Sequence, residues 1–217
     1  YNVSEHKITT EVQGHGGTIS GQGLDPYEVV SHGKDSQKNI IIEPDNGYRI
    51  NTVTINNNSV DIEPEEDGTY TLPKFINMTE DKHIVVTFIP KQYNVTINKN
   101  WDDNNNINEK RPSAIIVEML YNTEVLREIN MTGDSLQNSW MTSFVFDSTD
   151  ENGTPYDLSK ISFVEKEVNS NDLEFYDNEI SFNIDNDTLQ VEVTVNKTYR
   201  VPEITKEITF TKQWEDG

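Results

Sequence analysis

The chain has 217 residues, of which 33% are apolar, and its 38 acidic and 17 basic side chains give a formal net charge of −21. A charge of this sign excludes proteins that bind nucleic acid or anionic membrane surfaces by electrostatic attraction. The absence of cysteine excludes disulfides, thiol catalysis and cysteine-ligated metal sites. No apolar run approaches the length of a membrane span. Because the chain begins at Tyr1 without a signal peptide, we expect a processed or excised fragment.

The first 92 residues predict short strands separated by glycine-rich turns. Asp45-Asn-Gly47 has turn chemistry, and no stretch keeps a helical period. We therefore expect a β module over residues 1–92 that closes at Pro90-Lys-Gln92. The predicted strands cover residues 7–12, 39–43, 48–55, 69–72 and 83–89.

Several elements of this first module share a pattern of turn and strand residues. They are Gly16-Gly-Thr-Ile-Ser20, Ile42-Glu-Pro-Asp-Asn-Gly47-Tyr48, Val53-Thr-Ile55 and the closing segment 77–88. Together they resemble a bacterial surface repeat of the divergent internalin type. The resemblance implies a secreted β module.

Residues 93–201 also lack helical periodicity and predict about seven strands, for which a β-sandwich is the expected arrangement. The predicted fold class is therefore all-β, with two tandem β-sandwich-like modules, the second Ig-like or prealbumin-like. The predicted strands of this module cover residues 93–101, 113–121, 124–130, 139–146, 161–168, 180–184 and 189–199.

The opening strand of the second module recurs near the end of the chain. Val95-Thr-Ile-Asn-Lys-Asn-Trp-Asp-Asp103 and Ile208-Thr-Phe-Thr-Lys-Gln-Trp-Glu-Asp216 both alternate, and both place a lysine two residues before a tryptophan. The distance from Lys99 to Lys212 is 113 residues, about one sandwich domain. We therefore expect residues 202–217 to be a linker and the first strand of a further, truncated module.

Strand alternation places an unusual residue in the core of the second module. Lys99 shares a face with Val95 and Trp101, so it points inward, where an unpaired ammonium is costly. On the last strand the inward position after Val195 is Lys197. Asn196 therefore points outward unless a β-bulge shifts the register by one residue.

The order of motifs in the second module resembles the B-type repeat domain of the collagen adhesin Cna. The matching elements are Lys99-Asn-Trp-Asp-Asp103, Lys110-Arg-Pro112, Asn138-Ser-Trp-Met-Thr-Ser-Phe144, Ile161-Ser-Phe-Val-Glu-Lys-Glu-Val168 and Val195-Asn-Lys-Thr-Tyr199. The resemblance implies an intramolecular isopeptide bond between a lysine on the first strand and an asparagine or aspartate on the last. A neighbouring glutamate assists. It implies that Lys99 is the nucleophile and Glu165 the assisting carboxyl, with Glu167 as second choice.

The acceptor departs from the family pattern, because Lys197 occupies the position two residues before Tyr199. Three interpretations stay open. A bulge brings Asn196 inward and the Lys99–Asn196 bond forms, or Lys99, Glu165 and Lys197 form a buried ionic cluster without a cross-link. In the third, Lys99 extends to the edge of the sandwich.

Other candidate sites have simpler explanations. Asp102 to Glu109 offers oxygen ligands at alternate positions, but Ile107 replaces the glycine of a calcium loop and Ser113 its glutamate, so we predict a solvated turn. The histidines are scattered, and we expect no metal site and no cofactor. Trp101, Trp140 and Trp214 fit core or strand-end positions, and two exposed tryptophans would instead indicate a sugar-binding platform.

These observations predict a structural stalk or spacer module of a Gram-positive cell-surface adhesin or pilus-like protein. We expect no enzymatic activity beyond the autocatalytic bond, an extracellular location, and cell-wall anchoring through regions outside this chain. The expected partners are neighbouring modules of the same protein. One alternative is an adhesin fragment that binds a host matrix protein or glycan, and another is an accessory region of a secreted glycosidase. Nucleic-acid binding and membrane insertion are not expected.

Overall fold

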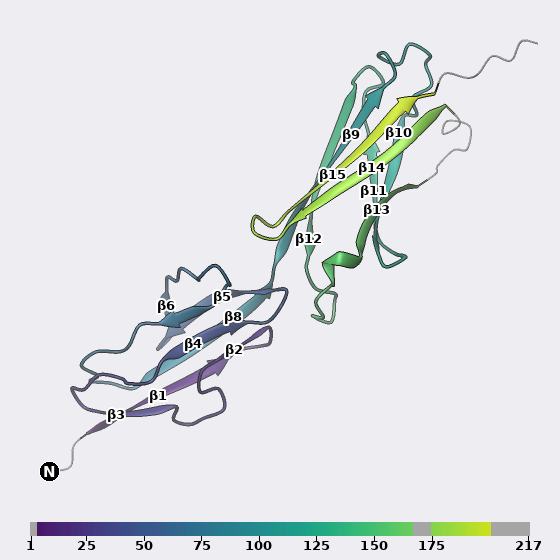
Figure 1. The fold of residues 1–217 in the computed structure, drawn as a ribbon. Helices are drawn as coiled ribbons and strands as arrows, with labels where there is room; N and C mark the ends of the chain where they lie inside the picture. The colour runs from purple at the N-terminus through teal and green to yellow at the C-terminus, as the bar shows by residue number, and fades with distance from the viewer. Residues whose placement is uncertain (1–3, 167–174, 201–217) are drawn as a thin grey trace, which may run out of the picture. The chain divides into compact units, whose positions relative to one another are not determined.

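The computed structural model describes residues 4–166 and 175–200 (Figure 1). Within these ranges every regular element is a β-strand, apart from the short 3₁₀ helix η1 (Leu158–Lys160). The all-β prediction is confirmed. It follows from the short alternating runs of β-branched and aromatic residues, which bury one face of each strand and expose the other.

The first module contains two sheets. The larger one has the strand order β3-β1-β8-β5-β6, with β1 and β8 parallel, and the smaller one has the order β2-β4-β7. The strands are β1 (Glu5–Val12), β2 (Gly17–Ile19), β3 (Glu28–Ser31), β4 (Ile40–Pro44), β5 (Tyr48–Ile55), β6 (Asn58–Val60), β7 (Tyr70–Leu72) and β8 (Lys82–Pro90).

One apolar core joins these two sheets. Ile8, Ile84 and Val86 come from the larger sheet and Ile42 from the smaller one, and all four are 0% exposed. At the start of β5, Gly47 adopts a φ of 80°, a conformation that side chains with a Cβ rarely reach, so the predicted turn there is confirmed.

The remaining strands form a three-stranded sheet, β11-β10-β13, and a four-stranded sheet, β12-β9-β15-β14. Burial alternates along β9, where Tyr93, Val95, Ile97, Lys99 and Trp101 are buried. The same alternation buries Val191, Val193, Val195 and Lys197 on β15. The strands are β9 (Gln92–Asp102), β10 (Ala114–Tyr121), β11 (Glu124–Thr132), β12 (Ser139–Asp147), β13 (Ile161–Lys166), β14 (Tyr176–Asp185) and β15 (Gln190–Tyr199).

The density of contacts divides the chain into two compact units. The first comprises Tyr1–Val95, Phe144–Lys160 and Ile184–Val191, and the second Thr96–Ser143, Ile161–Asn183 and Glu192–Gly217. This boundary passes through β9, β12, β14 and β15, so it differs from the predicted division into residues 1–92, 93–201 and 202–217, which stays a prediction. The candidate site described below lies wholly in the second unit.

The structure adds elements that the sequence patterns did not predict. The strands β2, β3 and β6 have only three or four residues, too few for a period of two to stand out. Strand β14 begins at Tyr176, four residues before the predicted start. The prediction missed this part of the strand because Asp177, Asn178 and Glu179 are polar and exposed and show no alternation.

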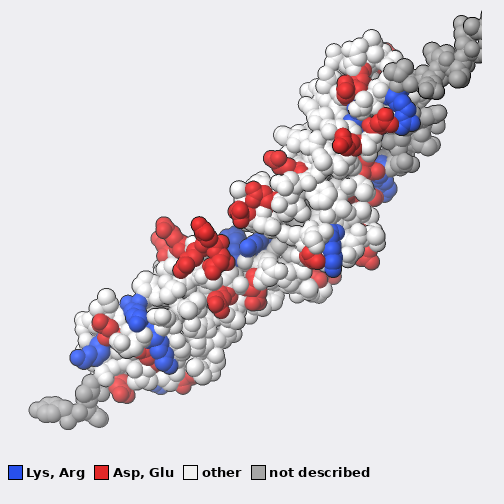
Figure 2. Space-filling model, viewed as in Figure 1, with Lys and Arg blue, Asp and Glu red and all other residues white. Residues whose placement is uncertain are grey.

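Charged side chains are distributed over the surface of both units. Figure 2 shows acidic side chains spread over the visible face, with lysine and arginine side chains between them. This matches the acidic composition, and an excess of one charge keeps a protein soluble.

Candidate functional site

Three ionisable side chains meet in the core of the second unit. Lys99 on β9 is 0% exposed and Lys197 on β15 is 2% exposed, and the Glu165 side chain on β13 is 3% exposed. Strands β9 and β15 are neighbours in the four-stranded sheet, whereas β13 belongs to the three-stranded sheet. The inward orientation predicted for all three residues is confirmed, and the cluster connects the two sheets of the sandwich.

Glu165 and Lys197 form an ion pair in this cluster. Lys197 Nζ lies 2.8 Å from Glu165 Oε1. The second carboxylate oxygen of Glu165 is buried and has no hydrogen-bond partner among the described residues. The pair therefore holds the two sheets together through one carboxylate oxygen, and either charge alone in this position would be strongly destabilising.

Lys99 has a different environment. Its Nζ donates hydrogen bonds to the backbone carbonyl oxygens of Asn100 at 3.0 Å and Val195 at 3.4 Å, and it lies 4.0 Å from the centroid of the Trp101 ring. Burial lowers the pKa of Lys99 from its ordinary value of 10.5 to about 7; the charge of Glu165 opposes this shift and that of Lys197 adds to it. A substantial fraction of Lys99 is therefore the neutral amine at pH 7.

Asn196 does not join the cluster. Its side-chain oxygen accepts a hydrogen bond from Asn100 Nδ2 at 3.1 Å, and Asn100 is exposed. Burial alternates without interruption from Val191 to Lys197 on β15, which leaves Asn196 on the outer face of the sheet. The structure thus brings Lys99, Glu165 and Lys197 together and places Asn196 on the opposite face. Glu167 lies outside the described residues.

A second buried ion pair was missed by the sequence analysis. Arg111 Nε donates to Asp103 Oδ2 at 2.6 Å, and its Nη2 donates to Oδ1 of the same carboxylate. Arg111 Nη1 also donates to the carbonyl oxygens of Ser135 and Gln137, at 2.8 and 2.9 Å, and Tyr176 donates its hydroxyl to Asp103 at 3.1 Å. Arg111 therefore ties the loop after β9 to the loop before β12.

This network corrects one prediction. The turn from Asp102 to Glu109 is not fully solvated, because the Asp103 side chain is 1% exposed. Burial raises the pKa of Asp103, but hydrogen bonds from Arg111, Asn106 and Tyr176 outweigh burial and hold it below its usual value. The available signal was Arg111 within the Lys110-Arg-Pro112 motif close to Asp103, since a buried arginine needs a carboxylate partner.

The tryptophans of the second unit belong to the core. Trp101 and Trp140 are 5% and 4% exposed, and their rings meet edge to face with centroids 5.3 Å apart. The predicted core role is confirmed for these two residues, and a sugar-binding platform built from them is wrong. Trp214 lies outside the described residues.

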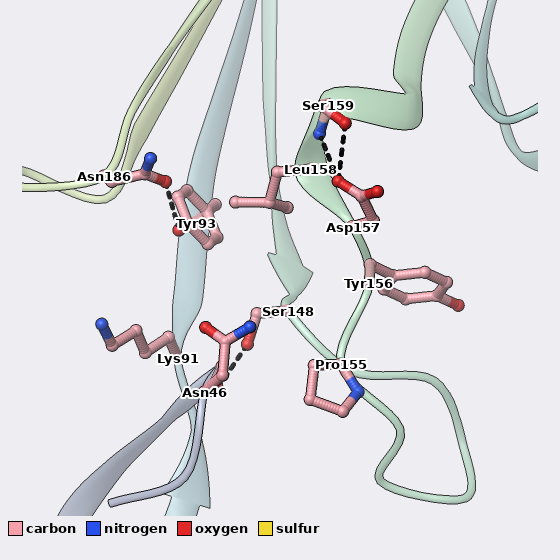
Figure 3. Close-up of a pocket in the computed structure, with 11 residues that line it drawn as sticks. Asn46, Lys91, Tyr93, Ser148, Pro155, Tyr156, Asp157, Leu158, Ser159 and Asn186 are labelled. Atoms are coloured by element: carbon pink, nitrogen blue, oxygen red, sulfur yellow. Dashed lines mark hydrogen bonds between the residues drawn. The ribbon is translucent and has the colours of Figure 1, made fainter.

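One groove with many polar lining residues lies within the first unit. It encloses about 540 Å³ and is shown in Figure 3. Several of its polar groups are partnered with one another: the Tyr93 hydroxyl donates to Asn186 Oδ1 at 2.8 Å, and the backbone N–H and hydroxyl of Ser159 both donate to Asp157 Oδ1. We find no pairing of a nucleophile with a base here.

A second groove lies beside β1 in the first module. It encloses about 490 Å³ and is lined by Thr9, Glu11, His83 and Leu24, whose side chain is 55% exposed. No group of three or more histidine, aspartate or glutamate side chains in the described part of the chain is placed to hold a metal ion. No helix there is long and apolar enough to cross a membrane.

Comparison with known proteins agrees with the geometry of the second module. Residues 95–187 match the family model described as the Cna protein B-type domain. This segment is a Cna B-type domain. The match falls inside residues 93–201, and it covers the strand that carries Lys99 and the strand that carries Glu165. The resemblance of residues 1–92 to a divergent internalin-type repeat stays a prediction.

Among solved structures, a single B repeat unit of the collagen-binding surface protein Cna of Staphylococcus aureus is 14% identical, with a TM-score of 0.34. The match covers 91% of this chain and 98% of that one. A structure of two such repeats is 12% identical, with a TM-score of 0.34, and the match covers 92% of this chain and 50% of that one. The pilus adhesin SpaC of Lactobacillus rhamnosus GG is 15% identical, with a TM-score of 0.30, over 70% of this chain and 24% of that one. Such scores carry no argument about function. No curated protein matches the chain.

Proposed function

We propose that the chain is a structural spacer in an extracellular surface protein of the adhesin or pilus type. The observation that carries this proposal is the B-type domain over residues 95–187, since modules of this kind are repeated units of the adhesin after which the family is named. The interior supports a mechanical role, because its buried charged pairs, Glu165 with Lys197 and Asp103 with Arg111, join strands and loops of the second unit.

A replacement experiment in the complete surface protein tests this role. Deletion of residues 1–201 is expected to abolish attachment of intact cells while the isolated adhesive region keeps its affinity. Insertion of unrelated β modules of the same total length is expected to restore attachment, because a spacer contributes distance and stiffness only. Restoration by the native sequence alone would contradict the spacer role.

We also propose that the module holds its first and last strands without the Lys99–Asn196 bond. Support comes from the inward Lys197, paired with Glu165, and from the outward Asn196, bonded to Asn100. Protease digestion of the denatured chain is expected to release Lys99 and Asn196 on separate linear peptides. A branched peptide containing both residues would contradict this proposal and would restore Glu165 to the role of assisting carboxyl.

The alternative function is binding of a host matrix protein or glycan by the first module. The groove beside β1 and the exposed Leu24 favour it. Residues 1–92 immobilised on a surface and probed with collagen, fibronectin and a glycan array test this function. Both variants are made in the whole chain, immobilised in place of the fragment; binding that is lost in Leu24→Asp but kept in Leu136→Asp, a matched exposed leucine outside the groove, would establish the alternative.

A further inference from the structure

We propose that Lys99 is a neutral, titratable amine in the core of the module, and that its protonation weakens the packing between the first and last strands. The stability of the module then depends on pH through one buried group. This property is independent of whether the module acts as a spacer or as a ligand-binding fragment.

The hydrogen bonds of Lys99 match a neutral amine. A neutral amine has two N–H donors, whereas an ammonium has three. Nζ has two oxygen acceptors in the described part of the chain, the carbonyls of Asn100 and Val195. A third donor, which only an ammonium has, makes no hydrogen bond to a described residue, and the Trp101 ring centroid lies 4.0 Å from Nζ. A cation–π contact offsets part of the cost of burying a charge but does not replace an oxygen acceptor.

The charged groups around Lys99 are already paired with each other. On β13, Glu165 is bound to Lys197 of β15 at 2.8 Å. In the loop after β9, Asp103 is bound to Arg111, whose side chain is 0% exposed. Glu165 keeps one carboxylate oxygen without a hydrogen-bond partner among the described residues, but its single negative charge is already balanced by Lys197. Protonation would therefore place a second cation beside the Glu165–Lys197 pair.

The direction of the pH dependence follows from the two states. In the unfolded chain Lys99 titrates near 10.5, and in the folded chain its pKa is about 7. Between these values the unfolded state binds more protons, so the free energy of unfolding rises as the pH rises. Below about pH 7 Lys99 is protonated in both the folded and the unfolded state, so its contribution to the free energy of unfolding no longer changes with pH. The module is therefore least stable in acid and becomes more stable towards alkaline pH.

Two measurements on the whole chain test this inference. The first is the unfolding equilibrium constant in urea, followed by tryptophan fluorescence, to which Trp101 and Trp140 of the second unit contribute. The ratio of this constant in the wild type to that in Lys99→Met is expected to fall at least tenfold from pH 7 to pH 9. The same ratio formed with Lys160→Met, a side chain that is 50% exposed, is expected to stay constant.

The second measurement keeps the inference testable if Lys99→Met does not fold. The protein is labelled with ¹⁵N at lysine, and the Nζ resonance of Lys99 is identified as the one that is absent from the NMR spectrum of Lys99→Arg. The change of this resonance with pH then gives the titration midpoint of Lys99. A midpoint near 7 supports the inference. A midpoint near 10, or an amide resonance that does not titrate, would overturn it, as would a flat ratio of unfolding constants between pH 6 and pH 9.5.

Discussion

Lys197 Nζ lies 2.8 Å from Glu165 Oε1, and both side chains are almost completely buried between the two sheets of the B-type module. A lysine here occupies the place where the family resemblance requires an amide acceptor. The pair therefore gives the module a different means of holding its last strand to the opposite sheet, through an ion pair that can break and re-form.

Removing one partner of this pair is expected to be more damaging than removing both. Lys197→Met leaves the Glu165 carboxylate buried and unpaired, which costs about 3–5 kcal/mol of unfolding free energy. The double variant Lys197→Met with Glu165→Leu replaces the pair by apolar side chains and is expected to recover most of that loss. Urea denaturation measures both. A double variant as unstable as the sum of the single ones would contradict the pairing.

The position of Lys197 also predicts that one substitution there would allow a covalent bond to form with Lys99. Lys197→Asn places a side-chain amide on the inward face, near the Lys99 amine and the Glu165 carboxyl. The Lys99 Nζ is then expected to form a bond to the new amide carbon, and ammonia is expected to leave. The variant is expected to be lighter than its own sequence by one ammonia. The double variant with Lys99→Met serves as the control and is expected to show its full mass.

The Asp103–Arg111 pair predicts that two substitutions near the loop after β9 lower the stability of the module by different amounts. Tyr176→Phe removes one hydrogen bond to Asp103 and is expected to cost about 0.5–1.5 kcal/mol. Asp103→Ala leaves the Arg111 guanidinium buried without its carboxylate and is expected to cost about 3–5 kcal/mol. Thermal unfolding at pH 7 measures the series. Equal losses in the two variants would contradict the assignment of Asp103 as the counterion.

Gly133 is expected to tolerate no side chain. A Cβ built on its backbone would lie 2.2 Å from Trp140 Cδ1, a ring atom of a residue that is only 4% exposed. Gly133→Ala must therefore displace the indole, and we expect a loss of about 1–3 kcal/mol with a shifted tryptophan emission. An unchanged emission in Gly133→Ala would show that the ring does not pack on Gly133.

Much of the fold could be predicted from the sequence because period-two alternation is a local property. Parity with Val95, Phe163 and Val195 predicts that Lys99, Glu165 and Lys197 face inward; both lysines are buried and the Glu165 side chain is 3% exposed. Parity cannot say which lysine takes the carboxylate, since that depends on how β13 lies across β9 and β15. The Asp103–Arg111 pair was missed because it depends on a turn geometry that alternation does not describe.

The mass of the intact chain tests the central claim most directly. An ion pair leaves the composition unchanged, so the whole chain is expected to have the mass given by its sequence, and reduction or denaturation should not alter it. A chain lighter by one ammonia, with the loss abolished in Lys99→Met and in Asn196→Ala, would show that Lys99 and Asn196 are cross-linked. That result would contradict the ionic core.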